Sequence, residues 1–355
     1  MVSVQFEDIQ AAARNIAGGI YDSPCPSSEQ LSAVAGCEVF CKLDYLQRTG
    51  SFKERGALNA LKLLSGEQKH KGVIAASAGN HALGLSYHGQ RLGVPVTVVM
   101  PNFAPLMKVA NCKRLGAEVV QFGDDFDSAR KHAVELSRQR GLTYVHGFDD
   151  PAIIAGQGTM GLEILEQVPD LDAIVVPIGG GGLIAGVSLA VKTLRPKMKV
   201  FGVEPARAAS FQAAIRAGTP VDFPVAFTIA DGLAVSQVGA NAFEIARKHV
   251  DKVVSVDEQA ITLAVLRLVE LEKSVVEGAG AVPLAACMAG LLPELMGKRV
   301  ALPLTGGNID TSVLGAIMAR GLVADGRLHQ FAAQISDRPG GPCILRQSSV
   351  PKGPA

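Results

Sequence analysis

Short apolar runs alternate with helical patterns along most of this chain, and the alternation constrains its fold more than any other feature. The runs expected to form strands lie at 39–43, 73–76, 96–100, 118–122, 143–146, 173–177, 200–203, 253–256 and 300–304. Patterns with apolar residues three and four apart occupy most of the intervals between them. Strands separated by helices predict right-handed βαβ units and a parallel sheet. We therefore predict an open, doubly wound α/β protein, whose ligands bind beyond the carboxyl ends of the strands.

The charge balance argues against a polyanionic partner. Lys plus Arg number 34 and Asp plus Glu number 33 in 355 residues, a formal net charge of +1. Neither nucleic acid nor an anionic membrane is therefore an expected partner. No apolar run reaches the roughly 18 residues that span a bilayer, and the first residues lack the pattern of a secretory signal. We expect a cytoplasmic protein that binds a small molecule or another copy of itself.

The cysteines show no paired CxxC pattern that would indicate a zinc site. They stand at positions 25, 37, 41, 112, 287 and 343. We interpret them as mostly buried thiols in a reducing compartment.

Lys53 is the residue around which we place the chemistry. It lies in Arg-Thr-Gly-Ser-Phe-Lys-Glu-Arg-Gly at 48–56, after a predicted strand and a polar turn. Ser51 is a suitable N-cap for a helix over 52–64, which puts Lys53 in the first helical turn. The helix start and partial burial lower the pKa of an ammonium there, and a neutral amine can form a Schiff base with an aldehyde. For this residue alone, an ordinary solvated lysine is the alternative.

A turn between a predicted strand and a helix offers a site for a carboxylate. It reads Ser77-Ala78-Gly79-Asn80-His81. Its backbone N–H groups and the Ser77 hydroxyl form a donor-rich loop, and the Asn80 amide can donate to a phenolate oxygen. Ordinary capping of the helix by Ser77 or Asn80 is the alternative.

Two further turns offer groups for a phosphate and for a ring nitrogen. Gly179-Gly180-Gly181-Gly182 follows a strand and opens a helix, so the backbone there can wrap a phosphate. The spacing of acidic residues does not match a dinucleotide fingerprint. Thr305, in the turn Thr-Gly-Gly-Asn at 305–308, has a hydroxyl that can hydrogen-bond a heterocyclic nitrogen.

Together, the lysine and the turns supply what pyridoxal phosphate requires. From about residue 5 to 325 the sequence resembles the fold-type II pyridoxal-phosphate enzymes, and most closely the threonine/serine dehydratase and serine racemase group. The shared segments are 49–53, 77–81, 155–159 (Ala-Gly-Gln-Gly-Thr), 179–182, 229–232 (Ile-Ala-Asp-Gly) and 305–308. The resemblance implies a tryptophan synthase β-like fold with two open, mostly parallel sheets flanked by helices. It also implies a large cofactor-binding domain over 1–71 and 150–325 and a small mobile domain over 72–149.

The resemblance implies a role for each candidate residue. Lys53 is the Schiff-base lysine and Phe52 packs on the pyridine ring. Asn80 meets the ring hydroxyl, Thr305 meets the ring nitrogen, and the four glycines hold the phosphate. The residues expected around the substrate are Ser51, Ser77, Ala78, Gly79, Asn80 and His81.

The implied reaction releases ammonia from a hydroxy-amino acid. Lys53 removes the α-proton, the β-hydroxyl leaves, and hydrolysis gives 2-oxobutanoate from L-threonine or pyruvate from L-serine. Racemases of the group carry a serine at the position of Ala78, and a methyl group cannot return a proton to the α-carbon. We therefore expect a dehydratase. The alternatives are a serine racemase, a 3-hydroxyaspartate dehydratase, which needs a further cation near the substrate side chain, and a binding protein that kept the fold without cofactor.

Two segments depart from the pattern of the group. Relatives bind a divalent cation through a glutamate, an alanine carbonyl and an acidic residue, which correspond to Glu204, Ala208 and Ser210. A Mg²⁺ or Ca²⁺ site here would lack one anionic ligand. Residues 326–355 resemble a truncated start of an ACT-like regulatory domain, and we expect a loosely ordered tail. Relatives suggest a homodimer or homotetramer.

Overall fold

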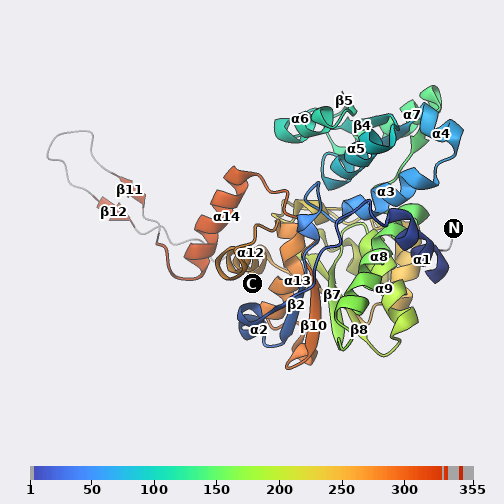
Figure 1. Ribbon diagram of the computed structural model, residues 1–355. Helices are drawn as coiled ribbons and strands as arrows, with labels where there is room; N and C mark the ends of the chain where they lie inside the picture. Colours follow the sequence, from blue (N-terminus) through green and yellow to red (C-terminus); the bar gives the residue numbers. More distant parts are fainter. Residues whose placement is uncertain (1–3, 330–331, 335–343, 347–355) are drawn as a thin grey trace.

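The computed structural model describes residues 4–329, 332–334 and 344–346, and its helices surround two separate sheets (Figure 1). The strands of the larger sheet are β1 (Ser27–Ser28), β2 (Glu38–Lys42), β7 (Ala173–Pro177), β8 (Lys199–Pro205), β9 (Lys252–Val256) and β10 (Arg299–Pro303). Those of the smaller sheet are β3 (Val73–Ala76), β4 (Val96–Met100), β5 (Glu118–Gln121) and β6 (Thr143–Tyr144). The helices are α1 (Phe6–Ile16), α2 (Glu29–Ala35), α3 (Lys53–Leu63), α4 (Gly66–Lys71), α5 (Asn80–Leu92), α6 (Leu106–Arg114), α7 (Phe126–Arg140), α8 (Pro151–Gln167), α9 (Gly182–Leu194), α10 (Ser210–Ala217), α11 (Ala240–His249), α12 (Glu258–Glu272), α13 (Gly278–Met288) and α14 (Thr311–Ala324).

Both sheets are mostly parallel. The larger has the order β1-β2-β10-β7-β8-β9 and the smaller β5-β4-β3-β6. Every pairing within them is parallel except that of β1 with β2. The predicted fold class, two open and mostly parallel sheets flanked by helices, is confirmed.

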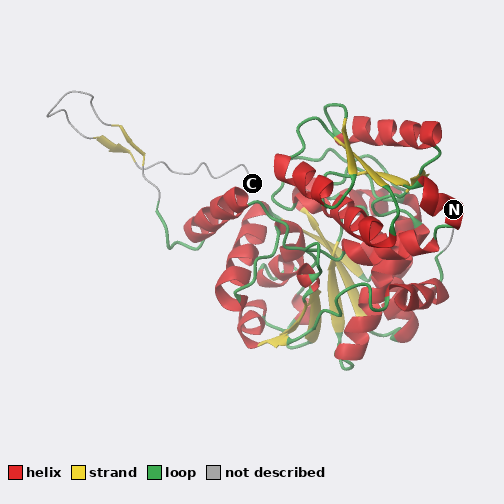
Figure 2. Cartoon of the chain, turned by 45° about the horizontal axis from the view of Figure 1, so that its top comes forward, coloured by secondary structure: helices red, strands yellow, loops and turns green. Residues whose placement is uncertain are grey.

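Helices cover both faces of the larger sheet (Figure 2). Along β7, Ile174 and Val176 pack with α1, α8, α9 and α11, whereas Ala173 and Val175 pack with α2, α12 and α13. Successive side chains of a strand point to opposite faces, so a strand covered on both sides must be apolar throughout. That requirement explains why β7 reads as an uninterrupted apolar run.

The smaller sheet is built in the same way from the residues between 73 and 144. Val73 and Ala75 on β3 pack with α3, α5 and α6, while Ile74 and Ala76 pack with α7. Helix α3 lies between the two sheets and packs against both α5 and α8 (Figure 1). The lysine that begins α3 is therefore placed at the junction of the two sheet layers.

The prediction that Ser51 caps this helix is wrong. Helix α3 begins at Lys53, and its N-cap Phe52 makes no side-chain capping bond. The backbone of Ser51 instead pairs with Gly306 in an isolated antiparallel bridge, and the Ser51 hydroxyl is buried without a hydrogen-bond partner. Because Ser51 pairs with Gly306, in the turn after β10, its side chain is not in position to cap α3.

Five of the six cysteines are buried free thiols, as predicted, while Cys343 lies outside the described residues. Among the described helices, none combines the length and apolarity needed to span a membrane. The predicted loosely ordered tail falls largely outside the described residues. Of it, β11 (Ala332–Gln334) and β12 (Ile344–Arg346) pair with each other in antiparallel fashion.

Candidate active site

A cavity of about 1010 Å³ opens at the carboxyl ends of the parallel strands. It is lined by the turn after β3, the glycine run after β7 and the turn after β10, with Phe52 and Lys53. The structure thus brings together the groups predicted for cofactor and substrate. Ser51 is the exception, since it is fully buried and does not line the cavity.

The Lys53 amine, the group predicted to carry the chemistry, lies in the cavity. Its Nζ donates to the carbonyl oxygen of Gly147 at 2.8 Å and lies 5.2 Å from the centroid of the Phe52 ring. Burial lowers the pKa of Lys53 to about 8, and the nearby Glu277 carboxyl opposes that effect only in part. A useful fraction of the amine is therefore neutral near physiological pH, as nucleophilic or basic chemistry requires.

The turn at 77–81 leads from β3 into the first turn of α5. The backbone N–H of Gly79 donates to the Ser77 hydroxyl at 3.2 Å, and α5 begins at Asn80 without a side-chain cap. The first N–H groups of a helix have no partner within the helix, and they favour an anion. The turn can therefore receive a carboxylate.

The His81 ring is neutral in this setting. Burial, together with the charge of Lys53, lowers its pKa to about 3. Its Nε2 lies 3.3 Å from the Val145 carbonyl oxygen, while Nδ1 has no hydrogen-bond partner. With the proton on Nε2, Nδ1 can only accept, so a carboxylate would be held by the backbone N–H of His81 and not by its ring.

The glycine run forms the start of α9. Gly181 has φ +92° and is the N-cap of the helix, a conformation that L side chains rarely adopt. At Gly180 an added Cβ would come within 2.2 Å of the Phe148 ring. The glycine backbone therefore borders the cavity without side chains. An anion placed there would face the positive end of the helix dipole.

Thr305, after β10, and Asn80, after β3, also line the cavity. Thr305 is 2% exposed, and its hydroxyl makes no hydrogen bond within the described part of the chain. The Asn80 amide donates to Glu277 Oε1 at 2.8 Å and keeps a second N–H. Both residues have polar hydrogen-bonding capacity left for a ligand.

Several polar residues of the cavity were not singled out from the sequence. They are Lys108, Arg130, His146, Glu277 and Asn308. Lys108 on α6 forms an ion pair with Asp231 of the short helix η3 (Asp231–Leu233) at 3.2 Å, which joins the two sheet layers beside the cavity. An acidic residue directly before a helix that starts with small residues was the only sequence feature that could have indicated Glu277. That feature does not identify its partner Asn80, which lies far away in the sequence.

A buried ion cluster anchors α3. The Arg55 guanidinium is fully buried and donates to Asp44, Glu163 and Thr159, with its Nε 2.6 Å from Asp44 Oδ2. Burial opposes the charge of Asp44, but Arg55 lowers the pKa of that carboxyl. Because Arg55 is two residues from Lys53, the cluster also fixes the start of the lysine helix.

The segment expected to bind a cation has a different use in the structure. Glu204 accepts hydrogen bonds from the backbone N–H groups of Phe211 and Gln212 at 2.6 and 3.0 Å. Burial raises the pKa of Glu204 to about 7, and the Ser210 hydroxyl is buried without a partner. Among the described residues, no group of three His, Cys, Asp or Glu side chains could hold a metal ion.

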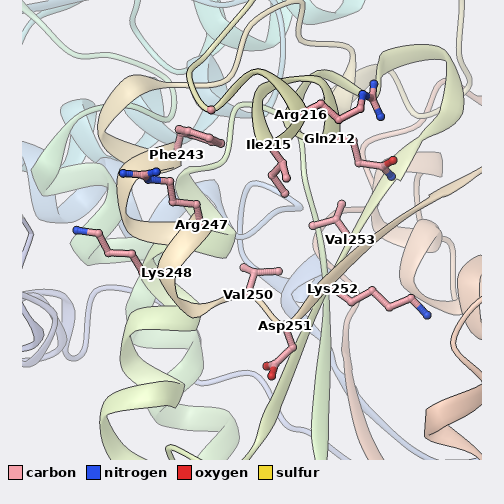
Figure 3. A pocket seen from close by; sticks show the side chains of 11 residues that line it. Gln212, Ile215, Arg216, Phe243, Arg247, Lys248, Val250, Asp251, Lys252 and Val253 are labelled. Carbon is pink, nitrogen blue, oxygen red and sulfur yellow. The ribbon is translucent and has the colours of Figure 1, made fainter.

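A second cavity, of about 730 Å³, lies between α10, α11 and β9 (Figure 3). Ile215, Val250 and Val253 face its middle, whereas the charged ends of Lys248 and Lys252 point away from it (Figure 3). The cationic groups do not converge on a common point. The cavity at Lys53 is therefore the better candidate for a site of chemistry.

The fold and the Lys53 cavity are those of an α/β enzyme that holds a phosphorylated aldehyde cofactor on a lysine. An amine of lowered pKa, a glycine-lined helix start and a free neutral hydroxyl all fit pyridoxal phosphate. The model of the pyridoxal-phosphate dependent enzyme family matches residues 16–306, and the chain belongs to this family.

The similarity to individual proteins extends over most of the chain. It is 44% identical to an L-threonine ammonia-lyase of Thermotoga maritima over 337 residues, which are 95% of this chain and 84% of that protein. The structure matches the processed form of threonine deaminase isoform 2 from Solanum lycopersicum with a TM-score of 0.84, at 38% identity, over 88% of this chain and 91% of that one. It also matches serine racemase from Dictyostelium discoideum with a TM-score of 0.82, at 36% identity, over 87% of this chain and 100% of that one.

Proposed function

We propose that this chain is a pyridoxal-phosphate-dependent ammonia-lyase that converts L-threonine, L-serine or both to 2-oxo acids and ammonia. The observation that carries the proposal is the Lys53 amine, whose pKa is lowered to about 8 in a cavity that also holds a carboxylate-binding turn and a phosphate-binding helix start. The L-threonine ammonia-lyase of Thermotoga maritima, at 44% identity, supports the choice of reaction.

The residues of the cavity have distinct roles toward the cofactor. Gly179, Gly180, Gly181 and Gly182 would hold its phosphate, and Phe52 would pack on its ring. Thr305 would meet the ring nitrogen and Asn80 the ring oxygen. Pyridoxal phosphate supplies an electron sink for the negative charge that develops at the α-carbon.

Lys53 acts as the base for the α-proton once its amine is free. A base with a pKa near the working pH combines a usable neutral fraction with the capacity to take a proton. Burial gives Lys53 that pKa. The resulting ammonium stays beside the Gly147 carbonyl oxygen, which accepts a hydrogen bond from Nζ at 2.8 Å.

The substrate carboxylate would be bound by the turn at 77–81. The Ser77 hydroxyl and the backbone N–H groups at the start of α5 supply the donors. Binding there fixes the orientation of the α-carbon relative to Lys53. Residues 72–149 are proposed to move as a unit and close over the substrate, with the ion pair of Lys108 and Asp231 as one contact across the mouth.

Ala78 favours dehydratase over racemase activity. Its methyl group lines the cavity but has no proton to give. A serine racemase is the second candidate, supported by the match to the Dictyostelium discoideum enzyme. A 3-hydroxyaspartate dehydratase is a third, because Arg130 on the cavity wall provides the extra cation that such a substrate needs, although its guanidinium already pairs with Asp127 at 3.2 Å.

Three further properties belong to the proposal. A Mg²⁺ or Ca²⁺ ion at Glu204, Ala208 and Ser210 stays a prediction, and the unpartnered Ser210 hydroxyl is the observation in its favour. A homodimer or homotetramer is proposed from the resemblance to the group. A cytoplasmic location is proposed from the free, buried thiols.

To test this proposal, the protein is loaded with pyridoxal phosphate and mixed with L-threonine, L-serine or 3-hydroxyaspartate. Both 2-oxo acid and D-amino acid are then measured. We expect 2-oxo acid from threonine or serine, little D-serine, and loss of turnover in Lys53→Ala. We also expect Ala78→Ser to raise the ratio of D-serine to pyruvate at least tenfold, because it places a hydroxyl at the α-carbon. Dominant D-serine from the unaltered chain would contradict the role given to Ala78. Product from 3-hydroxyaspartate alone would show that the chain is a 3-hydroxyaspartate dehydratase.

A further inference from the structure

Glu277 is a buried carboxyl on the wall of the Lys53 cavity, with 5% of the residue exposed. It occupies the N-cap position of α13 but makes no side-chain capping bond there. An acidic N-cap ordinarily accepts from the N–H groups of its own helix. The Glu277 carboxyl instead accepts from Asn80 Nδ2 on α5, at 2.8 Å.

Hydrogen bonds from two sides fix the orientation of the Asn80 amide. Asn308 Nδ2 donates to the carbonyl oxygen of Thr49 at 2.6 Å and to Asn80 Oδ1 at 2.8 Å. The amide oxygen of Asn80 must therefore face Asn308, and its nitrogen must face Glu277. Of the two N–H bonds of Asn80, one is used by Glu277 and the other is left for a ligand.

Glu277 also lies close to the backbone of Gly306. The Glu277 N–H donates to the Gly306 carbonyl oxygen at 2.9 Å. A Cβ added to Gly306 would come within 2.3 Å of Glu277 Oε1. The carboxyl is thus packed against the turn that carries Thr305, between that turn and α5.

The charged groups around Glu277 come from three other elements. They are Lys53 on α3, Lys108 on α6 and Asp231 on η3. Burial and then the charge of Asp231 raise the pKa of Glu277 to about 8, while the Asn80 hydrogen bond and the two lysines act in the opposite direction. At pH 7 the group is mostly a neutral acid, which accepts from Asn80 without placing a second negative charge next to a phenolate.

We propose that Glu277 is a positioning residue of the active site, which holds the Asn80 amide so that its remaining N–H points at the ring oxygen of pyridoxal phosphate. The inference rests on the proposed function, because it takes the role of Asn80 toward the cofactor from there. Glu277 acts through Asn80 and does not itself react. Its loss should therefore change cofactor binding and the cofactor's spectrum, and not turnover alone.

The experiment compares Glu277→Gln with Glu277→Leu. Glutamine keeps an acceptor oxygen for Asn80 but cannot ionise, whereas leucine removes the acceptor. The dissociation constant of pyridoxal phosphate and the visible absorption spectrum of the loaded protein are measured from pH 7 to pH 9. Glu272→Gln is the matched control, since Glu272 is a part-buried carboxylate that accepts from Ser28 and does not line the cavity.

We expect the glutamine variant to bind cofactor within about twofold of the parent at pH 7, and the leucine variant to bind about tenfold more weakly or worse, with a shifted absorption band. A leucine variant with the parent's cofactor affinity and an unshifted absorption band would overturn the proposal.

Asn308→Ala tests the same amide from its other side if the leucine variant does not fold. The alanine frees the Asn80 amide to turn over, so cofactor affinity should fall and the band should shift in the same direction. An Asn308→Ala protein with the parent's affinity and spectrum would refute the proposal. A parent chain that forms no adduct with pyridoxal phosphate, by contrast, would overturn the proposed function together with this inference, which distinguishes the two failures.

Discussion

Replacing Lys53 by methionine should make the cofactor-free protein more stable at pH 7. The folded state lowers the pKa of Lys53 from 10.5 to about 8. The folded state therefore binds the Lys53 proton less tightly than the unfolded chain does. Keeping Lys53 charged in the folded state costs about 3 kcal/mol at pH 7. Methionine has a similar length and no charge, so it removes this cost.

The hydrogen bond from Nζ to the Gly147 carbonyl oxygen, at 2.8 Å, opposes part of the gain. A bond from a charged donor contributes about 1.5 kcal/mol, so the net stabilisation of Lys53→Met is about 1 to 2 kcal/mol at pH 7. The cost is fully present below pH 8 and declines as the pH rises toward 10.5. At pH 9 it is about 2 kcal/mol, and the two proteins should then be nearly equal in stability.

Urea unfolding of the cofactor-free proteins at pH 7 and pH 9 measures this difference. Lys113→Met is the control, because Lys113 is exposed on α6 and its loss should change stability little at either pH. A Lys53→Met protein that is less stable than the parent at pH 7 would refute the reasoning. So would an advantage that does not shrink between pH 7 and pH 9.

Two other substitutions follow directly from the packing. Arg55→Met leaves the buried Asp44 carboxylate without its guanidinium partner, while Glu163 keeps its ion pair with Lys42. We therefore expect a loss of about 3 to 5 kcal/mol in unfolding free energy by urea titration, against little change for the exposed Arg91→Met. A loss below about 1 kcal/mol would show that the cluster is not a stabilising anchor. Gly180→Ala puts a Cβ 2.2 Å from the Phe148 ring, so we expect at least tenfold weaker binding of pyridoxal phosphate by absorbance titration, whereas Gly315→Ala, where the added atom meets nothing within 4 Å, should bind normally. Equal affinities in the two alanine variants would contradict the assigned contact.

Much of the candidate site could be read from local sequence because its parts are local devices. A strand followed by Ser77-Ala78-Gly79 or by four glycines ends at the edge of a parallel sheet, and all such turns meet at the same edge. The same logic placed Lys53 at the start of a helix. Local signals were missed where they were short: α4 has a capping box between Ser65 and Gln68 that predicts a helix start.

The sequence by itself determined the α/β class, since strands buried on both faces must be apolar throughout and helices must cover them. It also indicated which turns line the Lys53 cavity. Only the tertiary structure decided that Ser51 pairs with Gly306 and so does not cap α3. It alone brought Glu277 to Asn80, which is 197 positions away. Hydrogen bonds of that kind depend on how two sheet layers pack, and no periodicity within either segment records the partner.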